Sequence, residues 1–369
     1  MRIFVQIGLL FFAVYSASAL SKVYESYGEK FTVQEIFKTE GVIWGMTEVS
    51  DSEVLLSLRE GKIFWLNYET GESREIKNAP EVWSSGQGGL LDIYALKKDK
   101  KTWIYLTYSE PVSGGEATTS LIKGEWKDQK LINQKRIFRS KAQNSKTRHF
   151  GSRILVTSKD EIFMSIGDRG ERDKAQELNS HQGKILRLNL EGKAMEGNPV
   201  FEQEGALPEV WSYGHRNPQG LSLHPKTGEL WSVEFGPRGG DEINLIKPGL
   251  NYGWPVVTYG KEYWGPSIGV GTHKEGMEQP IAHYTPSISP SGMDFYSGDL
   301  FSKWKGHLFL AALGDEHLHH IVLDGRKVLK QAKLLEDLNE RIRQVRKVSS
   351  GHLLLSTDSG KVFKLSPAP

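Results

Sequence analysis

The chain has no cysteine among its 369 residues. Disulfides therefore cannot hold the fold together, and no lipid can be attached through a thiol. The charge shows little excess of either sign, with 47 Lys and Arg against 45 Asp and Glu. A balanced charge of this kind creates no strong field. We therefore expect neither nucleic acid nor an anionic membrane surface as a partner.

Long apolar runs are scarce outside the N-terminus. Residues 3–14 are almost entirely apolar, and Ala17-Ser18-Ala19 fits the small-residue cleavage site of a secretory signal. The run is too short to span a bilayer comfortably. We expect a cleaved signal peptide over residues 1–19, no stable membrane insertion, and a periplasmic or secreted protein. An uncleaved membrane anchor is the alternative.

Sustained helical periodicity is also scarce, and short units of strand, turn and strand recur instead. Each unit has an apolar strand followed by an alternating one, as in the blade of a β-propeller. The early strand at residues 31–37 would complete the last blade and close the ring. The six units pair residues 53–58 with 62–66, 103–107 with 120–122, 161–166 with 183–188, 228–233 with 241–246, 306–311 with 320–323, and 351–356 with 360–365.

These units predict an all-β fold, a six-bladed β-propeller formed by residues 20–369 as a single domain. A β-sandwich or two small β domains is the alternative. The longest insertions, at about residues 168–182, 190–210 and 254–292, are rich in Gly, Pro, Asn, Tyr and Trp. Long loops on one face of a rigid β scaffold are where we expect the site.

Two segments contain candidates for proton transfer and for polarising a substrate. His149 stands just before a strand, and imidazole is the side chain best suited to accept a proton near neutral pH. Arg216 and Asn217 lie between Gly214 and Pro218, a setting typical of a tight turn whose donors point outward. A filler histidine and a purely structural turn with a solvated arginine remain the alternatives.

Two further segments contain candidates for binding ions. Gly236 and Pro237 are followed by Asp241 and Glu242, and hard calcium ions prefer such carbonyl and carboxylate oxygens. A glycine-rich hairpin is the alternative. In residues 341–343, a strand would place two arginines on one face, where they repel each other unless an anion joins them. A solvated face is the alternative there.

Taken together and in this order, the motifs resemble the soluble quinoprotein aldose sugar dehydrogenases, the glucose/sorbosone dehydrogenase family. The resemblance runs from about residue 35 to the C-terminus. It rests on residues 86–92 (GQGGLLD), 149–151 with Arg153, 166–168 (IGD), 182–187 (QGKILR), 214–220 (GHRNPQG), 236–237 with 241–244 (DEIN), 251–255 (NYGWP) and 341–343 (RIR).

The resemblance implies an oxidoreductase that oxidises the anomeric carbon of an aldose sugar to a lactone. His149 matches the general base that removes the proton of the anomeric hydroxyl, and Gln87 matches a side chain of the same pocket. The hydride passes to pyrroloquinoline quinone (PQQ). Arg216 and Asn217 match residues over the reactive carbonyls of that cofactor, where Arg216 stabilises developing negative charge. The electron acceptor, the particular sugar and the choice of monomer or homodimer are left open.

The resemblance also implies calcium. Gly236 and Pro237 match backbone carbonyls that hold a calcium ion against the cofactor, where the ion acts as a Lewis acid. Glu242 and Tyr252 match a second, structural calcium site of some members.

Arg341 and Arg343 match the pair that binds the cofactor carboxylates. Two positions elsewhere in the sequence, Gly314 and Arg148, depart from the family pattern. Gly314 stands where members often have a lysine that contacts the cofactor, so one positive charge is missing. Arg148 stands where some glucose-oxidising members have an acidic residue, and a neighbouring cation lowers the proton affinity of His149.

Two other functions compete with the dehydrogenase. One is a catalytically silent propeller that binds a glycan or a protein, which a weaker cofactor site would favour. The other is a calcium-dependent lactonase, which needs a central cluster of carboxylate and Asn side chains. Retention of the histidine together with the arginine pair favours the dehydrogenase, because a binding module needs no proton acceptor beside an anion cradle.

Overall fold

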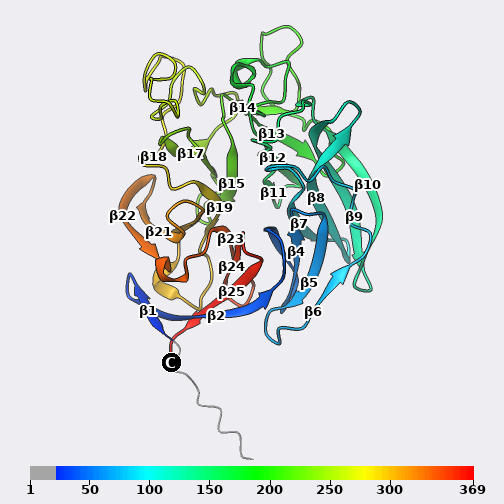
Figure 1. The fold of residues 1–369 in the computed structure, drawn as a ribbon, viewed down its shortest axis with the longest axis vertical. Coiled ribbons are helices and arrows are strands. Elements are labelled where there is room, and N and C mark those ends of the chain that lie inside the picture. The colour runs from blue at the N-terminus through cyan, green and yellow to red at the C-terminus, as the bar shows by residue number, and fades with distance from the viewer. Residues whose placement is uncertain (1–21) are drawn as a thin grey trace, which may run out of the picture.

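A computed structural model describes residues 22–369, in which six antiparallel sheets are arranged around a common axis (Figure 1). The signal peptide expected over residues 1–19 lies outside the described residues. Within residues 22–369 there is no helix of the length and apolarity that a membrane crossing requires. The structure confirms the six-bladed β-propeller, and neither a sandwich nor two separate β domains is present in residues 22–369.

In the first five sheets the strands follow one another along the chain. The first sheet contains β3 (Ile43–Ser50), β4 (Glu53–Leu58), β5 (Lys62–Asn67) and β6 (Ser73–Ile76). The second contains β7 (Leu90–Lys98), β8 (Lys101–Val112), β9 (Glu116–Lys127) and β10 (Lys130–Arg139). The third contains β11 (Ile154–Val156), β12 (Glu161–Ile166), β13 (Lys184–Asn189) and β14 (Val210–Tyr213).

The remaining three sheets complete the ring. The fourth contains β15 (Pro218–Leu223), β16 (Leu230–Glu234), β17 (Asp241–Ile246) and β18 (Ala282–Tyr284). The fifth contains β19 (Pro290–Phe295), β20 (Leu308–Ala312), β21 (His317–Asp324) and β22 (Lys327–Leu334). The sixth contains β23 (Ile342–Lys347), β24 (Leu353–Thr357), β25 (Lys361–Pro367), β2 (Glu29–Lys38) and β1 (Val23–Ser26). Three short 3-10 helices lie in loops: η1 (Arg172–Gln176), η2 (Ser302–Trp304) and η3 (Glu336–Leu338).

The ring is closed by the N-terminal strand. β2 pairs antiparallel with β25, from Phe31 opposite Pro367 to Lys38 opposite Lys361. The expected closing strand at residues 31–37 is therefore confirmed, and it joins the two ends of the described chain in one sheet. Closure removes the unpaired edges that an open arrangement of sheets would expose.

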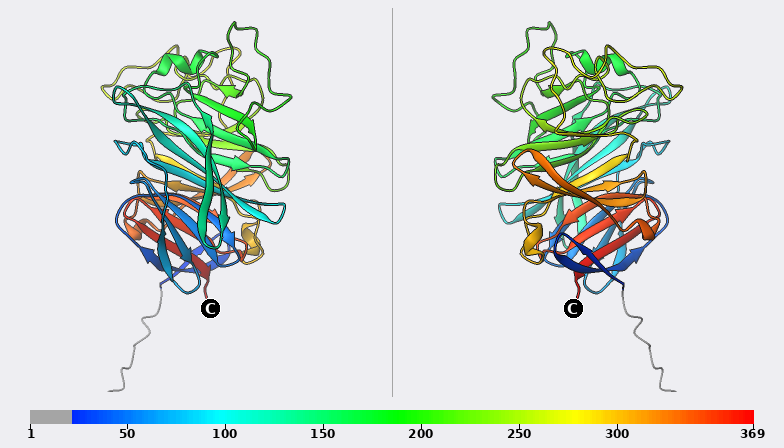
Figure 2. Two further views of the ribbon diagram at one scale, coloured as in Figure 1. Left: turned by 90° about the vertical axis from the view of Figure 1, so that its right-hand side faces the viewer. Right: turned by 90° about the vertical axis from the view of Figure 1, so that its left-hand side faces the viewer.

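The core lies between neighbouring sheets. Middle strands such as β12 and β20 are buried along their whole length, because a blade on each side covers both faces. Outer strands such as β10 are mostly exposed or half-buried. The cluster around Trp304, Phe309 and Phe363 fills the space between the fifth and sixth sheets. This packing makes the scaffold rigid, and the side views show the long loops projecting from it (Figure 2).

The first strand of each sheet packs closest to the axis, and polar groups tie these strands together. Arg153, beside β11, pairs with Asp92 of β7 at 2.9 Å, and both side chains are almost completely buried. The other carboxylate oxygen of Asp92 accepts the backbone N–H of Ile154 at 2.8 Å. A buried pair of this kind fixes the position of the segment just before β11. That segment contains His149.

Candidate active site

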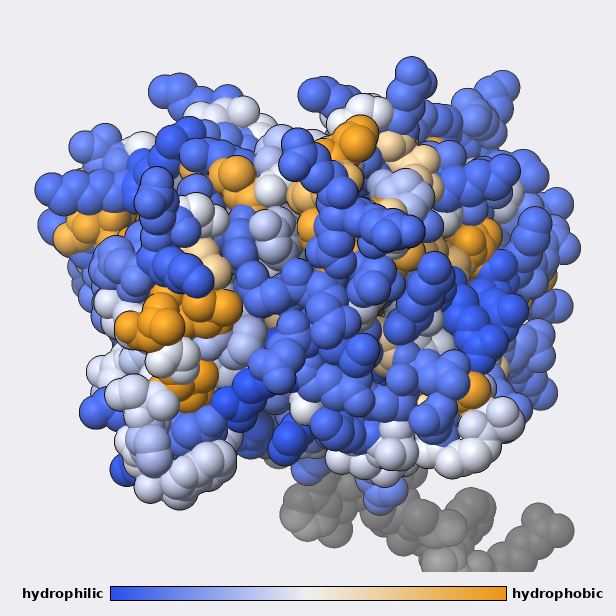
Figure 3. Space-filling view, turned by 90° about the horizontal axis from the view of Figure 1, so that it is seen from above, coloured by the Kyte–Doolittle hydropathy of each residue, from blue (hydrophilic) through white to orange (hydrophobic). Residues whose placement is uncertain are grey.

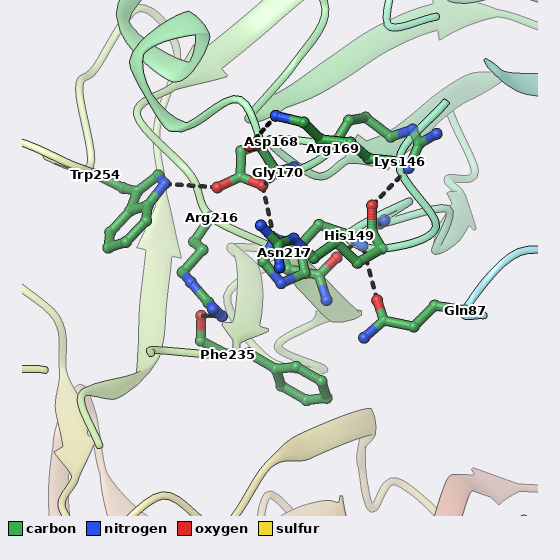
Figure 4. A network of polar contacts seen from close by, with 12 residues as sticks. Gln87, Lys146, His149, Asp168, Arg169, Gly170, Arg216, Asn217, Phe235 and Trp254 are labelled. Atoms are coloured by element: carbon green, nitrogen blue, oxygen red, sulfur yellow. Dashed lines mark hydrogen bonds and ion pairs between the residues drawn. The ribbon is translucent and has the colours of Figure 1, made fainter. Parts of the chain in front are cut away.

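His149 and Asp168 form a buried pair within a network of polar contacts (Figure 4). His149 lies in the loop between β10 and β11, and Asp168 follows β12 by two residues. The His149 Nδ1 and Asp168 Oδ1 atoms are 2.6 Å apart. The other oxygen of Asp168 accepts the indole N–H of Trp254 at 2.9 Å, and the Gly170 N–H donates to Oδ1 at 2.7 Å. The carboxylate is therefore held on both oxygens.

The backbone of His149 is in the left-handed region, with φ of +56°. Few residues other than glycine adopt this conformation, so the surroundings must stabilise it. The side-chain oxygen of Gln87 accepts the His149 N–H at 2.7 Å, and the Arg169 N–H donates to the His149 carbonyl at 3.2 Å. A β-carbon at Gly167 would lie 2.2 Å from that carbonyl oxygen, so the close approach requires glycine. Such local strain is common at active sites.

The protonation states of this pair follow from its environment. Burial lowers the pKa of His149, the hydrogen bond with Asp168 opposes this, and the charges of Arg216 and Arg148 lower it further. The net pKa lies below the ordinary value. Burial disfavours the ionised form of Asp168, but His149, Arg216 and the Gly170 N–H outweigh burial and lower its pKa. Asp168 is thus a carboxylate anion, which can accept hydrogen bonds but cannot donate them. In the neutral imidazole of His149, the ring proton therefore lies on Nδ1, the nitrogen that faces Asp168. Nε2 is left with a free lone pair.

Arg216 lies beside this pair. Its guanidinium carbon is 5.4 Å from the centre of the Trp254 ring, and Nη1 donates to the carbonyls of Phe235 at 3.2 Å and Gly236 at 2.8 Å. Its Nε is buried without a hydrogen-bond partner in residues 22–369. A buried donor without a partner is costly, and a bound oxygen atom would satisfy it.

Two adjoining hollows meet at Gln87. The outer one, about 380 Å³, is lined by Gln87, His149, Asp168, Arg216 and Pro237 among others, and it is called here the histidine hollow. The inner hollow has a volume of about 160 Å³ and is lined by aromatic rings and cationic side chains. Its lining includes Trp44, Arg59, Gln87, Phe150, Phe235, Arg341, Arg343 and Asp358. The structure thus brings Gln87, His149 and Arg216 together, with the arginine pair beside them.

The two arginines share a carboxylate. Asp358 accepts the Nε–H of Arg341 at 3.1 Å and two N–H groups of Arg343 at 2.8 and 2.9 Å. They therefore lie on one face, and the anion between them comes from the protein. With Arg59, the lining of the inner hollow carries three cations and one anion, a formal excess of +2. The hollow remains suited to a ligand with more than one carboxylate.

Asn217 lies beneath the hollows and is almost fully buried. Its side-chain oxygen accepts the Gly151 N–H at 3.1 Å and an amide N–H of Gln219 at 3.3 Å. Asn217 supports the loop that contains His149, and it does not line either hollow. The expectation that it contacts the cofactor stays a prediction.

Three of the four expected calcium ligands line a third, much smaller hollow. Gly236, Glu242 and Tyr252 line it together with Glu234. Pro237 lines the histidine hollow instead. The Tyr252 hydroxyl donates to the Leu245 carbonyl at 2.6 Å and accepts the Lys247 N–H at 2.9 Å, so the tyrosine would offer an ion its backbone. Nowhere in residues 22–369 do three or more His, Asp or Glu side chains gather in a metal-binding arrangement.

The acidic pair in this small hollow nevertheless fits a cation. Burial, followed by the charge of nearby Glu234, raises the pKa of Glu242 to about 8. Glu234 accepts hydrogen bonds from the His215 ring and the Arg216 N–H, at 2.9 and 2.7 Å. A hard cation between the two side chains would favour the ionised form of Glu242.

The two departures noted in the sequence lie at the edges of the hollows. Arg148 is exposed and lines the histidine hollow, and its charge does lower the pKa of His149, although burial and Arg216 contribute more. Gly314 donates its N–H to the Ile288 carbonyl at 2.9 Å. A β-carbon there would meet that carbonyl at 3.1 Å, so a longer side chain requires a small backbone shift.

Sequence reasoning did not assign roles to Asp168, Trp254 or Asp358. Asp168 and Trp254 lie in conspicuous motifs, but their contact joins residues 86 positions apart, and no local pattern encodes it. Asp358 was more accessible to inference, because β23 and β24 form a hairpin with Ile342 opposite Thr357. That register places the next residue, Asp358, beside the arginines. Of the three long insertions, residues 190–210 add nothing to the lining of these hollows.

Comparison with known proteins places the chain among sugar-oxidising proteins. A sequence profile described as "Glucose / Sorbosone dehydrogenase" matches residues 41–364. The aldose sugar dehydrogenase YliI of Escherichia coli strain K12 is 38% identical over 333 residues, which are 88% of this chain and 90% of that protein. The crystal structure of the soluble aldose sugar dehydrogenase (Asd) from Escherichia coli in the apo-form has a TM-score of 0.88 at 36% identity, covering 92% of this chain and 100% of that one. The PQQ-bound form of aldose sugar dehydrogenase (Adh) from Streptomyces coelicolor has a TM-score of 0.76 at 27% identity, covering 92% and 98%.

Proposed function

The chain belongs to the glucose/sorbosone dehydrogenase family, and from that premise we propose that it oxidises aldose sugars at the anomeric carbon with PQQ as cofactor. The observation that carries the proposal is the buried His149–Asp168 pair, which opens into a hollow beside a cationic cavity. The test is to add PQQ, calcium and a panel of aldoses to the purified protein with a dye acceptor. Sugar-dependent dye reduction supports the proposal, and its absence with every aldose contradicts it.

His149 is the proposed general base. Asp168 holds the Nδ1 proton, so Nε2 accepts the proton of the anomeric hydroxyl as the carbon–hydrogen bond breaks. The adjacent carboxylate then stabilises the imidazolium that forms. Because the pKa of His149 is lowered, the imidazole is neutral and ready to accept a proton throughout the neutral range.

PQQ fits the inner hollow by charge. When bound, it supplies the two-electron acceptor for the hydride of the anomeric carbon. Arg341 and Arg343 would hold its carboxylates, and Arg216 would place its unpaired Nε–H near the reacting oxygens. The formal +2 of the lining supports cofactor binding although Gly314 contributes no charge.

Replacing Arg341 with alanine is expected to weaken PQQ binding about tenfold to hundredfold, since one charge-assisted hydrogen bond is worth about 1.5–3 kcal/mol. The side chain is half exposed and is not part of the core, so the fold should persist. Titration of the apo-protein with PQQ measures the change. Arg326→Ala is the matched control, because Arg326 lines none of the hollows. Unchanged PQQ binding by the Arg341 variant would contradict the proposal that the arginine pair holds the cofactor carboxylates.

Calcium is proposed at the small hollow that contains Glu234 and Glu242. Adding calcium to the apo-protein should raise the midpoint of thermal unfolding by at least about 2 °C, because an ion that binds only the folded state stabilises it. Glu242→Gln should abolish the rise, and magnesium should give a smaller one because it prefers a tighter octahedral shell. A calcium effect of equal size in wild type and variant would place the ion elsewhere.

The alternatives have less support. A catalytically silent propeller would not need the strained backbone of His149 or the buried hydrogen bond between His149 and Asp168. A calcium-dependent lactonase requires a central carboxylate cluster, and residues 22–369 contain no such group of three or more side chains.

We further propose that the protein is exported through the N-terminal signal. The test is to express the chain in a secreting host and to determine whether it is cleaved between residues 19 and 20.

A further inference from the structure

Arg169 is an arginine with no exposed surface. Arginine normally belongs to a hydrophilic surface such as the face seen from above, where apolar residues form only small separate patches (Figure 3). Within residues 22–369 its guanidinium forms no ion pair with a carboxylate, and its Nε is buried without a hydrogen-bond partner. Burial lowers the pKa of Arg169 to about 10, although the charges of Asp168 and Glu171 oppose the shift. The group is still a cation at neutral pH, and burying it is costly.

The Arg169 side chain holds the residues on both sides of His149. Its Nη1 donates to the Arg148 carbonyl at 2.5 Å. Its guanidinium carbon lies over the Phe150 ring, 3.5 Å from the ring centre, so the flat cation packs on the aromatic face. One guanidinium therefore fixes the peptide group before His149 and the side chain after it.

The backbone of Arg169 holds His149 itself and is held in turn. The Arg169 N–H donates to the His149 carbonyl at 3.2 Å, and the Asn144 side chain donates to the Arg169 carbonyl at 3.1 Å. Nη2 of Arg169 donates to the carbonyl of Ala117 in β9 at 3.4 Å. Arg169 thus links the second sheet, the loop that contains His149 and the loop that follows β12.

His149 needs such support because its backbone is strained, with φ of +56°. Asp168 fixes the imidazole ring, and the next residue, Arg169, fixes the main chain that presents the ring; both appear in one network in Figure 4. Arg169 lines neither the histidine hollow nor the inner hollow. Any effect of its side chain on the reaction must therefore pass through the residues that it contacts.

Arg187 offers a comparison within the same protein. Its guanidinium also lies over an aromatic ring, 4.9 Å from the centre of Trp211. Unlike Arg169, it pairs with the Glu161 carboxylate, at 2.6 and 3.1 Å. Its Nη1 donates to the Glu196 carbonyl and to the side-chain oxygen of Asn198, at 3.2 and 3.3 Å. Every nitrogen of the Arg187 guanidinium has a partner, as expected of an arginine that stabilises the fold.

We propose that Arg169 is a positioning residue whose buried guanidinium holds residues 148–150 so that His149 is kept in place for proton transfer. This inference rests on the proposed function and adds a residue to it. A buried charge without a carboxylate partner lowers the stability of the fold, so stability alone does not explain its presence. Residues that serve activity and lower stability are common at active sites.

The first test compares Arg169→Met with Arg187→Met, using PQQ-loaded protein and an aldose that the wild type oxidises. Methionine is apolar and can contact the Phe150 ring through its sulfur. In Arg169→Met, kcat should fall about tenfold to hundredfold with KM for the sugar within about threefold, because a small displacement of the base is enough for such a loss. The midpoint of thermal unfolding should stay level or rise, since an unpaired buried charge is removed. Arg187→Met should show the reverse, an unchanged kcat and a midpoint lowered by at least about 2 °C, because Glu161 loses its partner.

A spectroscopic signal separates this inference from the proposed function. The Nδ1–H of His149, hydrogen-bonded to Asp168 at 2.6 Å, should give a low-field proton NMR resonance in the apo-protein, assigned by its absence from His149→Ala. This resonance should be lost or shifted upfield in Arg169→Met and retained in Arg187→Met. If wild type oxidises no aldose but the resonance changes in this way, the proposed function fails and the positioning of His149 by Arg169 stands. An unaltered resonance or kcat in Arg169→Met, or a larger fall of its unfolding midpoint than in Arg187→Met, would overturn the inference.

Discussion

Replacement of His149 by alanine is expected to lower turnover of every aldose substrate by about 10²–10⁴-fold, the range of a positioned general base. The anomeric hydroxyl would have to lose its proton to water, since the other groups near His149 in the histidine hollow are ill suited to the task. Arg148, Arg172 and Arg216 are cations, and the Asp168 carboxylate has its oxygens engaged by Gly170 and Trp254. Steady-state kinetics with a dye acceptor measures the loss.

Cofactor binding should change little in this variant, because the arginine pair and Arg59 line the inner hollow and His149 does not. PQQ titration of His149→Ala is therefore expected to give an affinity close to that of wild type. His273→Ala, an exposed histidine of the loop before β18, is the matched control and should be fully active. Added imidazole should restore part of the turnover of His149→Ala by occupying the vacated space. Unchanged turnover in His149→Ala would remove the assigned base.

The predicted fold followed from features that are local in sequence. The middle strands of the sheets are apolar because neighbouring blades cover both faces. β4 and β12 therefore coincide with predicted segments, and β16, β20 and β24 overlap theirs with ends shifted by one or two residues. The unit at residues 103–107 and 120–122 was predicted, but its strands are longer than expected, since β8 spans Lys101–Val112 and β9 spans Glu116–Lys127. The two strands continue as a long hairpin whose outer half is polar, and polarity conceals a strand from a search for apolar runs.

The site was less accessible to sequence reasoning. Arg341 and Arg343 were expected to need an external anion, yet the hairpin partner supplies Asp358. The strained φ of His149 cannot be read from its neighbours, because the Gln87 side chain and the Arg169 N–H that stabilise it come from two other loops, before β7 and after β12. Contacts between separate blades depend on how six sheets close into a ring. Family motifs located these residues, but their contacts had to come from the structure.

Asp168→Asn is expected to reduce kcat by about 10²–10⁴-fold, although Asp168 has both oxygens engaged within the protein. Its role is to position His149 and to fix the tautomer. An asparagine amide can turn its N–H₂ toward Nδ1, which would move the ring proton to Nε2 and leave the base without its lone pair. Asp173→Asn, an exposed carboxylate on the same loop, is the matched control and should retain activity.

The pH profile separates this positioning role from a purely structural one. In wild type, kcat/KM should rise with pH as His149 loses its proton, with the midpoint below the ordinary histidine value because burial lowers the pKa of His149. Asp168 opposes that shift, since its hydrogen bond and its charge both favour the imidazolium. Removing the carboxylate in Asp168→Asn should therefore move the acidic limb of the residual activity to still lower pH. A variant that loses activity at every pH with an unmoved limb has lost structure alone, and one whose limb moves upward contradicts the assigned pair.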